Sequence, residues 1–98
     1  MDAEEVKRTL ATHPELFQEF SVHELRLFGS TLRGDAGGAS DIDLLVDYTP
    51  GAQVGLFAFI RLRRRLSELL GFQVDLVTPD ALHPAIREGI LREAIRVA

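Results

Sequence analysis

The chain has 98 residues, 46% of them apolar, which is enough for one domain with a modest core and leaves no room for a second domain. A formal net charge of −4 argues against a protein whose main task is to coat nucleic acid. Cysteine is absent, so a metal site would need oxygen or histidine ligands, which favours hard cations such as magnesium. The sequence shows no signal peptide and no apolar run of membrane-spanning length, so we expect a soluble, cytoplasmic protein without a membrane partner.

The N-terminal segment is expected to hold two short helices and a strand. Asp2 can cap the first helix, which ends at the step into Pro14, and a short helical turn around Leu16 follows. Residues 22–28 are short, rich in large apolar side chains and bounded by Gly29. This pattern predicts a strand.

The next segment is expected to hold a helical turn, a loop and a second strand. Residues 30–33 are typical of one or two helical turns, whereas 35–39 contain two adjacent glycines and should form a loop. Residues 40–48 alternate in polarity, which predicts a strand with two distinct faces. One face carries Asp41, Asp43, Leu45 and Asp47, and the other, expected to meet the core, carries Ile42, Leu44, Val46 and Tyr48.

The second half is expected to add two helices and a third strand. Apolar residues recur three and four apart over 56–70, which predicts an amphipathic helix with Gly71 as its C-cap. Residues 72–78 alternate like a strand, and residues 84–96 combine helical apolar spacing with interspersed arginines. We therefore expect an α+β fold in which a small mixed sheet has helices packed on one face.

Gly29 and Ser30 lie where the first strand is expected to pass into a helical turn. Free backbone N–H groups and the positive end of a helix dipole favour a bound phosphate at such a junction. Glycine allows close approach of the phosphate, and the serine hydroxyl adds a directed hydrogen bond. The segment lacks the Gly-Lys-Ser/Thr of a Walker A loop, and an ordinary turn is the alternative interpretation.

Asp41 and Asp43 are two residues apart on a predicted strand, so their side chains leave the same face with Cα atoms roughly 6.5 Å apart. Two carboxylates at this spacing can converge on one magnesium ion or bridge a pair of ions. A solvated sheet face is the alternative. The strong strand formers around the pair favour a rigid, preorganised metal site.

A phosphate site beside two metal-binding carboxylates is what phosphoryl or nucleotidyl transfer needs. For this chemistry a third carboxylate is expected, because a hydroxyl that attacks phosphorus needs a base or a metal ligand beside it. Asp47 shares the face of Asp43 but lies roughly 13 Å away along the strand. Asp75 is the better candidate, since it lies between apolar residues of another strand, where an unpaired carboxylate would be costly.

The motif in residues 29–46 consists of GSTLRG, five further residues and SDIDLLV. It resembles the signature of the DNA polymerase beta nucleotidyltransferase superfamily, in particular that of the small bacterial and archaeal minimal nucleotidyltransferases. VDLV at 74–77 and the terminal ILREAIRVA extend the resemblance over most of the chain, while Leu32 replaces the usual small residue. The resemblance implies a palm-like nucleotidyltransferase fold, with residues 1–98 as one domain.

The same resemblance implies a role for each motif residue. The nucleotide-binding residues would be Gly29, Ser30, Arg33 and Ser40, with the first two holding the triphosphate of ATP. The metal-binding and catalytic residues would be Asp41, Asp43 and Asp75, which would hold two magnesium ions. Asp75 would also help to activate the acceptor hydroxyl.

Minimal nucleotidyltransferases often act as antitoxins beside a HEPN-family ribonuclease toxin. The resemblance implies that this chain neutralises such a toxin by binding it, by transferring AMP from ATP to one of its tyrosines, or by both. The chain has no additional domain to hold a small acceptor, which favours a macromolecular one. Neutralisation by binding alone and transfer to a small-molecule hydroxyl stay open as alternatives, and the sequence does not indicate the base preference.

Three further features have two interpretations each. The arginines at positions 61 and 63–65 could meet an acidic partner or nucleic acid, or form a solvated helix face. Apolar residues around Phe57 could form a protein interface or pack into the core. Tyr48 could accept AMP itself or pack within its strand.

Overall fold

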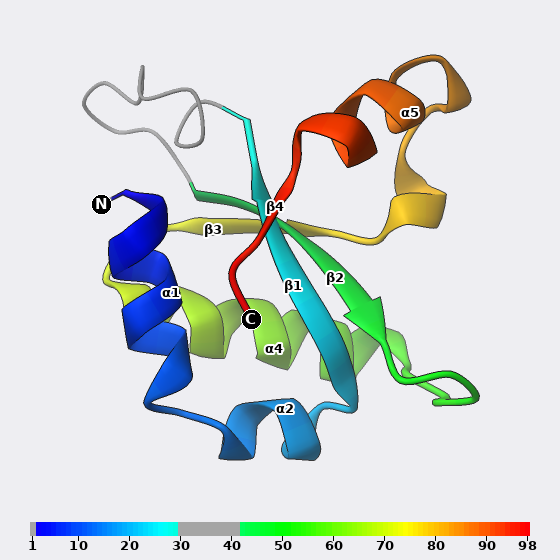
Figure 1. Ribbon diagram of the computed structural model, residues 1–98. Helices are drawn as coiled ribbons and strands as arrows, with labels where there is room; N and C mark the ends of the chain where they lie inside the picture. Colours follow the sequence, from blue (N-terminus) through cyan, green and yellow to red (C-terminus); the bar gives the residue numbers. More distant parts are fainter. Residues whose placement is uncertain (1, 30–41) are drawn as a thin grey trace.

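The computed structural model describes residues 2–29 and 42–98 (Figure 1). The helical turn expected at 30–33 and the loop expected at 35–39 lie outside these ranges. In chain order the elements are α1 (Ala3–Ala11), α2 (Glu15–Glu19), β1 (Val22–Phe28), β2 (Ile42–Tyr48), α4 (Leu56–Leu70), β3 (Val74–Val77), the 3₁₀ turn η1 (Pro79–Ala81), α5 (Pro84–Glu93) and β4 (Ile95–Arg96). Apart from the untested turn at 30–33, the expected helices and the three expected strands are therefore confirmed in type and order.

The four strands form one mixed sheet in the order β3-β2-β1-β4. β1 runs antiparallel to both β2 and β4, whereas β2 and β3 run parallel. A parallel pair needs a crossover connection, and the 15-residue helix α4 provides it. The α+β class with a mixed sheet is confirmed.

The core lies between the sheet and the three helices α1, α2 and α4. In Figure 1, α1 lies to the left of the strands and α2 below them. On β2 the side chains of Ile42, Leu44 and Val46 are buried in this core, as the alternation predicts. α5 lies above the sheet in Figure 1 and contributes no buried residue. We call the side of the sheet away from α1, α2 and α4 the open face.

Local signals explain where two of the helices begin or end. The Asp2 side chain accepts a hydrogen bond from the Glu5 amide at 2.9 Å and caps α1. Gly71 ends α4 in the left-handed region, with φ of +75°, where glycine avoids the strain of a β-carbon. Both caps were predicted from the sequence.

The C-terminal segment and the third strand differ from expectation. α5 ends at Glu93, and Ile95 and Arg96 pair with β1 as β4 instead of continuing the helix. The Val97 amide donates to the Leu25 carbonyl at 2.9 Å, and the Val97 side chain is buried. Pairing with the free edge of β1 therefore outweighs the local helical pattern. β3 is shorter than predicted, because it starts at Val74 and leaves Phe72 exposed.

Within residues 2–29 and 42–98, no helix combines the length and the apolar character needed to cross a membrane.

Candidate active site

Gly29 lies directly after β1, against the carboxylate of Asp43 on β2. The last residue of β1, Phe28, is the register partner of Asp43. A β-carbon at Gly29 would overlap the carboxylate oxygen of Asp43 and lie only 3.0 Å from its Cγ. Gly29 also has φ of +80°, which side-chain-bearing residues rarely adopt. Both constraints require glycine at this position.

Asp43 and Asp75 are register partners on the parallel strands β2 and β3. Paired residues of neighbouring strands point to the same face, and their backbones lie about 4.8 Å apart. Asp43 is half-buried, whereas Asp75 is exposed. The structure therefore brings two of the predicted carboxylates together on the open face, but the burial argument for Asp75 is wrong, because β3 is an edge strand.

The other predicted site residues divide into two groups. Ser30, Arg33, Ser40 and Asp41 lie outside the described residues. Asp47, the alternative to Asp75 as the third carboxylate, is exposed near the end of β2 and opposes Glu24 of β1.

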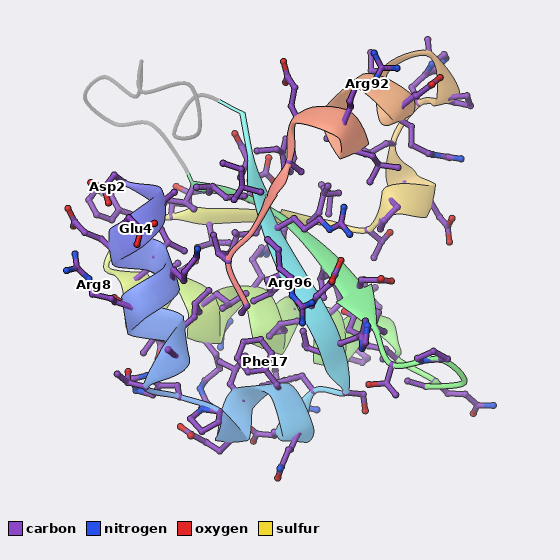
Figure 2. All side chains as sticks on the ribbon, in the orientation of Figure 1. Asp2, Glu4, Arg8, Phe17, Arg92 and Arg96 are labelled. Carbon is purple, nitrogen blue, oxygen red and sulfur yellow. The ribbon has the colours of Figure 1, made fainter. Side chains whose placement is uncertain are left out.

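A charged cluster on the open face was missed at the sequence level. Glu24 on β1 is buried, with 7% of its surface exposed. Its Oε1 lies 2.6 Å from Nη2 of Arg26, and its Oε2 lies 3.5 Å from Nε of Arg96 on β4, which Figure 2 shows beside β1. Arg26 opposes Leu45 of β2, so the cluster shares the face of Asp43. The spacing of Glu24 and Arg26, two residues apart in a strand rich in apolar residues, was the available signal.

The carboxylates that the structure describes fit a hard divalent cation. Asp43 and Asp75 offer oxygen ligands from two hydrogen-bonded strands, the donor type that magnesium prefers. Within the described ranges no group of three acidic or histidine side chains suits a metal, but the predicted ligand Asp41 lies outside those ranges. The donor chemistry of the described pair therefore agrees with the magnesium expectation.

Tyr48 packs at the far end of β2 rather than presenting its hydroxyl to solvent. Its Oη is buried and has no hydrogen-bond partner among the residues that the structure describes, and the side chain contacts the core. Burial raises the pKa of the Tyr48 phenol above its ordinary value of 10.0, because the charged form would lose its hydration. The packing interpretation is therefore favoured over self-modification.

Comparison with known proteins extends over nearly the whole chain. The model of the family described as nucleotidyltransferase domain matches residues 10–97. Protein adenylyltransferase MntA of Thermococcus cleftensis is 41% identical over 95 residues, which span 96% of this chain and 94% of that protein. A solved structure described as "putative minimal nucleotidyltransferase" has 39% identity and a TM-score of 0.78, and the match covers 97% of this chain and 95% of that chain.

The fold is also shared with a more distant structure. A chain from the solved complex of tri-AMPylated Shewanella oneidensis HEPN toxin with MNT antitoxin has a TM-score of 0.66 at 17% identity. The match covers 98% of this chain and 71% of that chain.

Proposed function

Because the chain belongs to the nucleotidyltransferase domain family, we propose that it transfers AMP from ATP to a hydroxyl group of a protein acceptor. The observation that carries this proposal is the alignment of Asp43 with Asp75 beside a glycine that has no space for a side chain. It offers a preorganised pair of carboxylates, and the glycine allows the Asp43 carboxylate to lie directly against the backbone. The similarity to a protein adenylyltransferase favours AMP and a protein acceptor.

Each predicted site residue has a role in the proposed chemistry. Gly29, Ser30, Arg33 and Ser40 bind the nucleotide phosphates. Asp41, Asp43 and Asp75 hold two magnesium ions, which when bound supply positive charge for the phosphates and the leaving group. The acceptor oxygen attacks the α-phosphorus, an O–P bond forms, and the bond to pyrophosphate breaks. Asp75 is exposed on the edge strand, where it helps to accept the proton of the acceptor hydroxyl.

The proposed acceptor is a tyrosine of a HEPN-family ribonuclease toxin, which the chain neutralises as its antitoxin in a hetero-oligomer. Two similarities support this choice. A relative that is 41% identical over 96% of this chain is named as a protein adenylyltransferase. A chain with the same fold was solved in a complex with an AMPylated HEPN toxin.

Transfer is tested by incubating the protein with ATP labelled at the α-phosphate, magnesium and the HEPN-family protein encoded beside it. We expect label on the HEPN protein and none with Asp41→Asn/Asp43→Asn. Asp47→Asn is the matched control, because it removes an exposed carboxylate of the same strand that we place outside the site. No transfer by the wild type, or transfer by the double variant, would contradict the proposal.

Neutralisation by binding alone is the competing function, and toxin rescue separates the two. If transfer is required, cells that express the toxin with the double asparagine variant stop growing. Full rescue by this variant would favour binding alone. A screen of small hydroxyl acceptors without a partner protein tests the remaining alternative, transfer to a small molecule.

A further inference from the structure

The solvent-facing side of α4 carries an exposed aromatic ring next to three arginines. Phe57, in the first turn, has 80% of its surface exposed. Arg61 follows four residues later and Arg65 four after that, with Arg64 between them, so these residues share one face of the helix. The buried residues of α4 lie on the opposite face. We call Phe57, Arg61, Arg64 and Arg65 the α4 surface.

A hollow of about 350 Å³ lies between this surface and α2. Its walls are formed by Glu19, Phe20, Ala58, Arg61, Arg64 and Arg65. Arg65 is held in place, because Nη1 lies 3.0 Å from Oε2 of Glu19 and its guanidinium lies 5.9 Å from the centre of the Phe20 ring. Within the part of the chain that the structure describes, Arg61 and Arg64 form no ion pair.

The positive charge of the α4 surface is local, because the whole chain has a net charge of −4. Gly55, the N-cap of α4, offers no side-chain cap, and the first turn of the helix has no acidic residue, so the positive end of the helix dipole lies beside Phe57. This combination attracts carboxylates. An exposed phenylalanine beside arginines is also typical of the anchor residues of protein interfaces.

We propose that the α4 surface docks an acidic segment of the acceptor protein, with carboxylates at Arg61 and Arg64 and an apolar side chain against Phe57. This inference rests on the proposed function for the identity of the partner. A protein segment is favoured over nucleic acid, because the net negative charge of the chain repels a phosphate backbone at longer range. α4 covers the core face of the sheet, whereas Asp43 points to the open face.

Docking and transfer consequently use opposite sides of the molecule and can be disrupted one at a time. Charge reversal on α4 weakens binding of the acceptor without changing the carboxylates. Loss of Asp43 stops transfer without changing the α4 surface. The partner must be large enough to reach both sides, which a folded protein is and a small molecule is not.

The test measures the affinity of the HEPN-family protein by calorimetry for Arg61→Glu, Arg64→Glu and Phe57→Ser. Arg63→Glu is the matched control, because Arg63 is exposed on the same helix but does not line the hollow. We expect each of the three variants to raise the dissociation constant about tenfold or more. We expect Arg63→Glu and Asp43→Asn to bind like the wild type. For Arg61→Glu, Arg64→Glu and Phe57→Ser, we expect the KM for the acceptor in the transfer assay to rise with little change in kcat.

Three results would overturn the docking surface, and a fourth would overturn the proposed function alone. Equal binding by Arg61→Glu, Arg64→Glu and the wild type overturns the docking surface, even if transfer is intact. An equal loss with Arg63→Glu also overturns it, because the effect is then general electrostatics. If Arg61→Glu and Arg64→Glu keep their affinity for the acceptor but lose affinity for a labelled single-stranded RNA, the surface is an RNA site instead. Arginine-dependent binding without any transfer supports docking and contradicts the proposed catalysis.

Discussion

At Gly29 the backbone and the Asp43 carboxylate occupy adjoining space, so this position allows a sharp test of the site. Gly29→Ala introduces a β-carbon that overlaps the carboxylate and must also adopt φ near +80°. The left-handed conformation alone costs about 1–2 kcal/mol. We expect a comparable loss in the free energy of unfolding, measured with urea, and a loss of AMP transfer because Asp43 is displaced.

Gly71→Ala is the control for this prediction. Gly71 has φ of +75°, but a β-carbon there meets no atom within 4 Å. It should therefore show the conformational cost without the loss of transfer. Similar activities for the two variants would mean that contact with Gly29 does not position Asp43.

The buried hydroxyl of Tyr48 leads to a second prediction. Tyr48→Phe removes an oxygen that has no hydrogen-bond partner within residues 2–29 and 42–98, and such a group costs about 1–3 kcal/mol when it is buried. The variant should therefore be at least as stable as the wild type at neutral pH, as measured by chemical denaturation followed by circular dichroism.

The pH dependence of this difference follows from the raised pKa of Tyr48. Above pH 10 the phenol ionises in the unfolded chain before it does so in the native protein, so the native state of the wild type loses stability as pH rises. Phenylalanine has no such group, and the stability gap between the two proteins should widen between about pH 9 and pH 11. A constant gap would mean that the phenol is hydrated in the native state.

At the scale of residues, the sequence predicted that Asp43 and Asp75 belong to one site, but it did not predict how exposed each side chain is. The alternation around Asp43 and Asp75 gave the face of each side chain, because the strand period is fixed. The exposure of Asp75 depends on β3 being an edge strand, and strand order is set by contacts between distant segments. The contact of Glu24 with Arg96 was missed for the same reason, since it requires β4.

At the scale of elements, the sequence predicted helices that have strong end signals and failed where tertiary pairing decides. The bounds of α4 agree with prediction, because 15 residues of amphipathic periodicity end at a glycine. The segment of β4 was interpreted as helix, because it directly follows the helical apolar spacing of α5 and Arg96 continues its interspersed arginines. No local signal distinguishes a short strand of this kind from a frayed helix end, and only the unpaired edge of β1 makes the difference.

The structure of this segment gives a third prediction. Val97 is 3% exposed beneath the edge of the sheet, and Val97→Ala removes two buried methyl groups. We expect a loss of about 2 kcal/mol in the free energy of unfolding. Ile95→Ala, at a side chain with 42% exposure, should cost clearly less. If the segment were a helical extension with Val97 in solvent, the order of the two losses would reverse or both would vanish.

At the scale of the whole molecule, a chain of 98 residues whose described elements share one core is expected to unfold cooperatively, so a ligand of the native state stabilises all of it. The aligned carboxylates of Asp43 and Asp75 are held together by the pairing of β2 and β3 and separate when the sheet unfolds. Magnesium should therefore raise the melting temperature. A site half-saturated at about 1 mM gains about 1.4 kcal/mol at about 10 mM magnesium, which corresponds to roughly 5–10 °C for a domain of this size.

The variants decide whether this stabilisation comes from the proposed site. Thermal unfolding is followed with magnesium, with EDTA, and with sodium chloride at equal ionic strength, so that general screening is subtracted. Asp43→Asn should lose most of the magnesium-dependent rise, and Asp75→Asn should lose part of it. Asp47→Asn, which changes the net charge by the same amount on the same strand as Asp43, should retain it. An equal rise in all four proteins would place the bound ion elsewhere and leave the aligned carboxylates without the cation that the proposed chemistry requires.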